Sequence, residues 1–290
     1  MDQDRPVGHL QQVPDHSISD ILSLQPKWGA VFQWRRLSAL GRLDSNDQLD
    51  EQLPGIIKDL QDRGIVFVLT TGRSVVGAKL YGERLGISHY VSYNGGYVLS
   101  DGEVIHDVKV PGNLAEMLCL HTNELGGTFI HYAYHTSRSN QPPIPLPMEY
   151  LLPEAEKSTG EDIRKDVHRV VLYLEEEDRS RLKPEVIGPA CFDEGDRLEV
   201  FPEGSKWTGI LPLIKKLGFS PDETVAIGNG MNDMEMITEA GFGIAMKNSP
   251  APLLEKADWV TEDLDHNGVT VALQKVFQME MEKQTSLIVS

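Results

Sequence analysis

The chain has 290 residues, of which 40% are apolar and 24% charged, and its formal net charge at pH 7 is −17. This balance is typical of a soluble globular protein of about two domains. No apolar run reaches the length of about 18 residues that a membrane span needs. The acidic charge argues against nucleic acid as a partner, because that affinity comes largely from neutralised phosphates.

Two widely separated cysteines, Cys119 and Cys191, predict buried thiols rather than a disulfide framework. The amino terminus lacks the features of a secretory signal, so the cytoplasm is the expected location. Residues 1–28 are polar, contain three prolines and show no periodicity. We expect them to form a disordered or loosely attached extension.

From Asp44 onward, helical and strand patterns alternate. Apolar residues at helical spacing predict an amphipathic helix that ends at Gly64; they are Leu53, Ile56, Ile57 and Leu60. The apolar run 65–69 predicts a strand of a parallel sheet that is covered on both faces. A turn at 70–74 then leads into a second helix, and another strand ends at Asn94.

The stretch that follows reads as an insertion, because strand-like segments at 128–132 and 170–174 alternate with charged helices and a proline-rich loop. The β/α rhythm resumes with a strand at 198–201 and continues through the strand before Gly228. We therefore predict an α/β fold with a doubly wound, mainly parallel, Rossmann-like core and an inserted α+β cap domain. The predicted parts are a core of residues 29–97 and 199–280, a cap of residues 98–198, and a tail over 281–290.

Polar side chains stand where three of the predicted strands give way to turns or helices. Gly228 to Asp233 follow a buried strand, and such turns are where open α/β sheets place their chemistry. The turn Thr71-Gly72-Arg73 offers a hydroxyl, backbone N–H groups and a guanidinium, which together can bind phosphate. Lys206 opens a helix, where a positive charge is mildly unfavourable, so a function is worth considering beside a solvated surface position.

In their order and spacing these motifs resemble the signatures of the haloacid dehalogenase (HAD) superfamily, in the branch of Cof-type sugar-phosphate phosphatases. The resemblance covers roughly residues 44–278 and includes the turn Asn94-Gly95-Gly96. It implies that a small phosphorylated metabolite is bound and that the cap chooses it. The phosphate-binding residues that it implies are Thr71, Gly72, Lys206 and Asn232. It also implies a Mg²⁺ site at Asn229 and Asp233, although the family has Asp where this chain has Asn229.

The family's first signature, Asp-x-Asp-Gly-Thr, supplies the nucleophile and the acid, and it is missing. By spacing from Thr71, the nucleophile position falls on Leu37 or Ser38. If residues 29–32 form the first strand instead, the two carboxylate positions become Gln33 and Arg35. No carboxylate occurs between Asp20 and Asp44, so we expect Mg²⁺ binding to be weakened or lost.

Three interpretations follow. The chain is a phosphatase with impaired hydrolysis, or a pseudophosphatase that binds phosphometabolites or regulates another process. Alternatively, the first 43 or so residues are a mistranslated segment that replaces a normal first strand, although this would leave Asn229 unexplained. Within the cap, His131 and His135 occur in a strand-like context and are expected at the surface rather than at a metal. The sequence predicts neither the substrate nor the oligomeric state.

Overall fold

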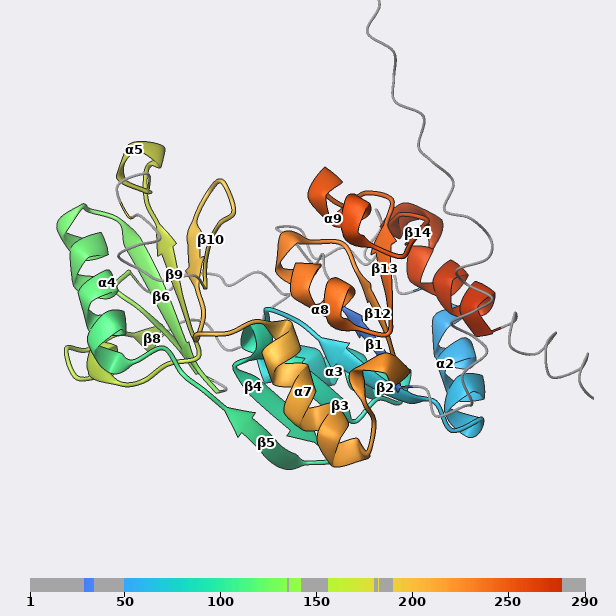
Figure 1. The fold of residues 1–290 in the computed structure, drawn as a ribbon. Helices are drawn as coiled ribbons and strands as arrows, with labels where there is room; N and C mark the ends of the chain where they lie inside the picture. The colour runs from blue at the N-terminus through green and yellow to red at the C-terminus, as the bar shows by residue number, and fades with distance from the viewer. Residues whose placement is uncertain are drawn as a thin grey trace, which may run out of the picture.

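The computed structural model describes residues 29–33, for which it gives the backbone, and residues 50–134, 136–141, 156–179, 182 and 190–277. Outside these ranges lie the expected extension over 1–28, the tail over 281–290, and Arg35, Leu37, Ser38 and His135. The described chain forms an eight-stranded sheet and a six-stranded sheet, which lie side by side in Figure 1. None of the helices in the described ranges is long and apolar enough to cross a membrane.

The larger sheet has the strand order β14-β13-β12-β1-β2-β3-β4-β5. All of its pairs from β14 to β3 are parallel, and the two pairs that involve β4 are antiparallel. Its strands are β1 (Gly29–Gln33), β2 (Val66–Thr70), β3 (His89–Ser92), β4 (Tyr97–Ser100), β5 (Glu103–Asp107), β12 (Thr224–Gly228), β13 (Phe242–Met246) and β14 (Trp259–Thr261). The chain runs outward from β1 in both directions, which makes the carboxyl end of β1 the switch point where such folds bind ligands.

Helices cover both faces of this sheet (Figure 1). On one face lie α2 (Leu53–Asp62), α3 (Val75–Leu85) and a helix over 268–277. On the other lie α7 (Lys206–Leu217), α8 (Met234–Glu239) and α9 (Ala251–Lys256). Within β2, Phe67 and Leu69 pack toward the first group and Val68 toward the second. Both faces are buried, which explains the continuous apolar run and confirms the predicted doubly wound fold.

The smaller sheet has the order β10-β11-β9-β6-β7-β8 and is antiparallel except for the β7–β8 pair. Its strands are β6 (Thr128–Ala133), β7 (Thr136–Ser139), β8 (Glu156–Lys157), β9 (Arg169–Tyr173), β10 (Cys191–Asp193) and β11 (Leu198–Val200). Helix α4 (Gly112–Glu124) packs on one face through Leu118. The other face, with Ile130 and Tyr132, joins the apolar cluster of the larger sheet.

The chain passes from one sheet to the other at residues that differ from the expected domain boundaries. The expected boundary between residues 97 and 98 falls inside β4, which pairs with β3 and continues the larger sheet to Asp107. At the return, β11 pairs with β9 and β10, so residues 199 and 200 belong to the smaller sheet. The chain therefore passes between the sheets just after β5 and just after β11. A strand's own residues do not specify which sheet it joins, which explains the difference.

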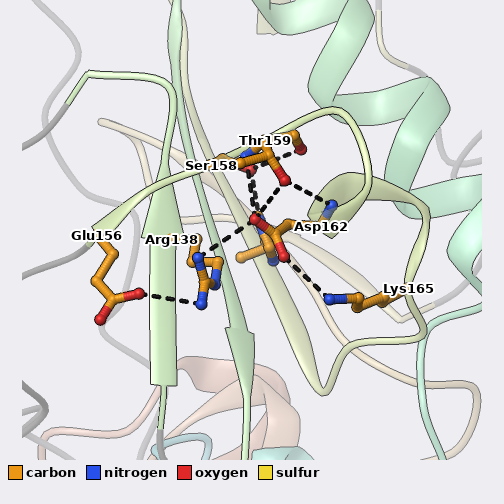
Figure 2. Close-up of polar contacts among 7 residues, drawn as sticks. Arg138, Glu156, Ser158, Thr159, Asp162 and Lys165 are labelled. Carbon is orange, nitrogen blue, oxygen red and sulfur yellow. Dashed lines mark hydrogen bonds and ion pairs between the residues drawn. The ribbon is translucent and has the colours of Figure 1, made fainter.

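A polar cluster anchors the loop of the smaller sheet that leads into η3 (Asp162–Arg164) (Figure 2). The Asp162 carboxylate accepts hydrogen bonds from the Thr159 hydroxyl at 2.7 Å and from its N–H at 3.1 Å. Arg138, at 3.3 Å, and Lys165, at 3.1 Å, add two positive charges. The Thr159 hydroxyl, ahead of these charges, holds the pKa of Asp162 well below its usual range. The cluster therefore fixes the loop against β7.

His131 lies in the same part of the smaller sheet and is only 4% exposed. Its Nε2 lies 2.9 Å from the Ser158 hydroxyl. The expected surface position is therefore wrong for His131, because its strand turns this side chain inward. Burial, the largest effect, lowers the pKa of His131 to about 4.

Candidate functional site

The turn after β12 is organised around the carboxylate of Asp233, the last residue of η5 (Met231–Asp233). Its Oδ2 accepts the backbone N–H of Asn229 at 3.0 Å and that of Gly230 at 2.7 Å. A Cβ at Gly228 would lie 2.8 Å from this carboxyl group. The small residues of the turn therefore allow the carboxylate to fold back over the strand end, where two N–H groups hold it.

Lys206, the first residue of α7, reaches the same carboxylate. Its Nζ lies 2.8 Å from Asp233 Oδ1, and both side chains are fully excluded from solvent. Ser205 caps the helix, since its hydroxyl accepts the Thr208 N–H and the Thr208 hydroxyl accepts the Ser205 N–H. The surface position considered for Lys206 is therefore wrong. A buried ammonium beside a buried carboxylate is costly to desolvate, so each charge depends on the other.

The loop after β2 brings Thr71, Gly72 and Arg73 to the same edge of the sheet. The Thr71 hydroxyl accepts the Arg73 N–H at 3.1 Å, which leaves the hydroxyl hydrogen for a ligand. Ser74 then caps α3 by accepting the Gly77 N–H at 3.2 Å. A Cβ at Gly72 would lie 3.4 Å from the ring of Phe201, so this loop packs beneath the segment that returns from the smaller sheet.

The turn Tyr93–Gly96 (residues 93–96, containing η1, Tyr93–Gly95) connects these parts. The Tyr93 N–H donates to the Arg73 carbonyl at 2.9 Å, and the Asn94 N–H donates to the Thr71 carbonyl at 3.1 Å. Asn94 Oδ1 accepts the Asn232 side-chain amide at 3.1 Å. The turn therefore joins the Thr71 loop to the Gly228–Asp233 turn.

Backbone geometry explains the residues of this turn. Asn94 has φ 57° and Gly95 has φ 105°, a region that Asn and Gly adopt most readily. A Cβ at Gly95 would lie 1.9 Å from the Ser205 carbonyl oxygen, so the turn presses directly against the start of the Lys206 helix. The sequence analysis noted this Asn-Gly-Gly turn only as a match to the family. Its contact with Asn232 was missed, although an Asn-Gly pair at a strand end is a signal for a special backbone conformation.

Gln33, which the second of the two alignments assigns to the nucleophile position of the family, is the last residue of β1 in the structure. Residues 29–33 form β1, with Gln33 opposite Thr70 and Phe32 opposite Ile227. The carboxyl end of β1 therefore lies between the Thr71 loop and the Gly228–Asp233 turn. Leu37 and Ser38, the positions of the first alignment, lie outside the described residues.

The residues of the Gly228–Asp233 turn offer few ligands for a divalent cation. A hard cation such as Mg²⁺ requires several oxygen ligands, usually with one or two carboxylates. Asp233 is the carboxylate of the Gly228–Asp233 turn, and its two oxygens already accept Lys206 and two N–H groups. No group of three acidic, histidine or cysteine side chains that could hold a metal is found within the described ranges. These residues do not fit Mg²⁺ as they stand.

Comparison with known proteins assigns the family. Residues 42–273 match the family described as haloacid dehalogenase-like hydrolase. The chain belongs to this family. The resemblance inferred from the motifs is thereby confirmed, and the matched residues begin downstream of β1.

The curated relatives of this HAD-like chain include proteins of Bacillus subtilis strain 168 that are named phosphatases, of which two follow. The putative phosphatase YkrA is 28% identical over 247 residues, which cover 80% of this chain and 93% of that protein. The 5-amino-6-(5-phospho-D-ribitylamino)uracil phosphatase YcsE is 27% identical over 248 residues, 81% of this chain and 91% of that protein.

Solved structures of HAD proteins share the fold. A haloacid dehalogenase-like hydrolase from Bacteroides thetaiotaomicron matches with a TM-score of 0.76 at 22% identity, covering 87% of this chain and 100% of that chain. The HAD subclass IIB sugar phosphatase BT4131 matches with a TM-score of 0.71 at 22% identity, covering 87% of this chain and 99% of that chain. At this identity the likeness concerns the fold.

Proposed function

We propose that the chain binds small phosphorylated metabolites, such as sugar phosphates, at the carboxyl ends of β1, β2 and β12, and that it hydrolyses them poorly. The observation that carries the proposal is the fully buried ammonium of Lys206 at this edge. The Thr71 loop and Asn232 are tied to the same place through Asn94. Relatives named as phosphatases support a phosphoryl group as the ligand.

We expect poor hydrolysis of phosphate esters because the chain lacks the aspartate that serves as the nucleophile in the family. Phosphate monoesters hydrolyse so slowly without a catalyst that enzymes supply accelerations approaching ~10²¹-fold. The family achieves this with an aspartate at the end of the first strand. This chain has no carboxylate between Asp20 and Asp44, and its first strand ends at Gln33. A glutamine does not form an acyl phosphate at a useful rate.

Magnesium ions serve the HAD phosphatases in general. Here Asn229 replaces a carboxylate, and Asp233 is already engaged by Lys206. The Lys206 ammonium is then the main fixed positive charge that neutralises a bound anion. This arrangement favours the second candidate function, a pseudophosphatase whose role is to bind phosphometabolites or to regulate another process.

Calorimetric titration with phosphate and vanadate tests the binding proposal. The parent is expected to bind both, and Thr71→Val is expected to bind roughly tenfold more weakly, because it loses one hydroxyl donor. Thr70→Val is the matched control, since Thr70 is the buried neighbour whose hydroxyl points at Met236. Equal affinities of parent and Thr71→Val would remove the support for the phosphate-binding loop.

A turnover assay tests the impaired chemistry. We expect little or no Mg²⁺-dependent hydrolysis of p-nitrophenyl phosphate or hexose phosphates by the parent. Replacing residues 30–43 with an Asp-x-Asp-Gly-Thr strand, together with Asn229→Asp, is expected to restore Mg²⁺ binding and at least weak hydrolysis. Clear turnover by the parent would contradict impairment. A repaired chain that binds Mg²⁺ but hydrolyses nothing would favour the binding protein.

A further inference from the structure

The turn Tyr93–Gly96 contacts the smaller sheet as well as the anion site. The Tyr93 side chain is fully buried, and its hydroxyl donates to the Tyr134 carbonyl at 3.0 Å. Its ring stacks on the imidazole of His168 with centroids 4.9 Å apart and planes at 19°. Tyr134 follows β6 and His168 precedes β9, so both belong to the cap. The first residue of the turn is therefore held by the cap through a ring and a hydroxyl.

Hydrogen bonds fix the protonation state of His168. Its Nδ1 accepts the Tyr134 backbone N–H at 3.0 Å, so this nitrogen carries no proton. Its Nε2 lies 2.9 Å from Asp107 Oδ1 and donates to it. The ring is therefore neutral, with its hydrogen on Nε2. A second proton has to bind at Nδ1, where it meets the Tyr134 N–H instead of an acceptor.

The surroundings of His168 are mixed in charge. Asp107 at the end of β5 favours a protonated ring, and Lys109, which pairs with Asp107 at 3.1 Å, opposes it. Among the described residues, the rings of Tyr93 and Tyr97 also contact His168, and Tyr97 approaches it edge-on from β4. The next residue in β9, Arg169, is paired with Glu199. Burial has the largest effect and lowers the pKa of His168, so the ring is neutral at neutral pH.

We propose that His168 is a positioning residue that clamps the turn Tyr93–Gly96, and with it the anion site, to the cap, and that a second proton on Nδ1 opens this clamp. In its neutral form, the His168 ring accepts the Tyr134 backbone N–H at Nδ1 and stacks on the Tyr93 ring. The turn then holds Asn232 through Asn94 and the Thr71 loop through its backbone. The inference rests on the proposed anion binding.

The clamp predicts an unusual sign for the effect of pH. In a chain of net charge −17, acidification neutralises carboxylates, and this change alone strengthens the binding of an anion. Opening of the clamp has the opposite effect, because it frees the turn that carries Asn94. Anion affinity that falls on acidification is therefore a signature of the clamp rather than of general electrostatics.

Calorimetric titration with sulfate tests the proposal, because sulfate keeps its charge over the range used. As the pH falls from about 8 through the range in which His168 takes up its second proton, which lies below its usual range, we expect the parent to lose roughly fivefold in affinity, the lower end of typical coupling between sites. His168→Phe keeps a stacking ring that cannot take a proton, so its affinity should not fall. His131→Asn is the matched control: it changes a buried cap histidine that contacts Ser158, and it should keep the parent's profile.

A second variant keeps the test decisive if His168→Phe does not fold. Asp107→Asn removes the carboxylate that favours the protonated ring, so the fall in sulfate affinity should move to lower pH. An unchanged midpoint in Asp107→Asn, or a parent whose affinity stays constant or rises on acidification, overturns the clamp and leaves anion binding intact. A parent that binds no sulfate at any pH overturns both proposals.

Discussion

The Lys206–Asp233 pair carries two opposite charges into a place that solvent does not reach. Asp233 also accepts two backbone N–H groups, so its carboxylate is fully satisfied. The Lys206 ammonium lies 2.8 Å from Asp233 Oδ1 in the same solvent-excluded place.

Lys206→Met is expected to lower the free energy of unfolding by about 3–5 kcal/mol, because it leaves the Asp233 charge buried without its partner. Urea unfolding measures this change. Lys58→Met is the matched control, since Lys58 forms an exposed ion pair with Asp62 and should change stability by less than about 0.5 kcal/mol. The double variant Lys206→Met/Asp233→Asn should recover much of the loss. A single variant as stable as the parent would contradict the dependence of one charge on the other.

In the same turn as Asp233, Asn229→Asp is expected to raise the affinity for Mg²⁺ without restoring turnover, because a metal ligand does not replace a nucleophile. Calorimetric titration with Mg²⁺ measures the affinity. Asn248→Asp adds the same charge at an exposed position and should leave Mg²⁺ binding unchanged. If both variants gain affinity equally, the effect comes from net charge and not from this site.

Among the elements, the turn Tyr93–Gly96 contacts the Thr71 loop, Asn232 and the start of α7. Gly95→Ala is expected to reduce both stability and sulfate affinity, because its Cβ would overlap the Ser205 carbonyl and separate the turn from α7. Gly102→Ala is the matched control: Gly102 also has positive φ, in the β4–β5 connection, but open space surrounds it. The control should cost about 1–2 kcal/mol of backbone strain and leave sulfate affinity unchanged. Unfolding and titration curves for the two variants separate these effects.

Local patterns predicted the elements well. The spacing of Leu53, Ile57 and Leu60 corresponds to the buried face of α2, and the apolar run before Thr70 corresponds to β2. The partners of β4 and β11 were not predictable, because a strand's own residues do not encode its neighbours. The side-chain contacts of the site could not be predicted for the same reason, because Asn94 and Asn232 are 138 positions apart in the sequence. The strand-end positions of Thr71 and Asp233 could be predicted, but their hydrogen bonds could not.

At the scale of the whole molecule, histidines that folding removes from solvent contribute to the response to acid. Burial lowers the pKa of His131 to about 4 and lowers those of His89 and His168. In the unfolded chain these rings take up protons near pH 6.5. The unfolded state therefore binds more protons below this pH, and the free energy of unfolding is expected to fall as the pH drops below about 6.5.

His131→Asn should reduce the loss of unfolding free energy between about pH 6.5 and about pH 4. At about pH 4 the loss should be smaller than in the parent by up to about 3 kcal/mol. Urea unfolding at a series of pH values measures the slope. His121→Asn, which changes an exposed histidine of α4, is the control. A parent of constant stability between about pH 7 and about pH 5 would be inconsistent with buried neutral rings.

The apolar cluster that passes from the larger sheet through Tyr93, Tyr97 and Phe201 to Ile130 and Tyr132 has a consequence for engineering. The cap is not an interchangeable module. Cutting the chain at the two crossings would expose aromatic rings on both halves, so an excised core should aggregate. A cap transplanted from a relative would have to supply surfaces complementary to Tyr93 and Phe201 before it could offer a new specificity. Packing at the junction of the two sheets therefore limits which caps this core could accept.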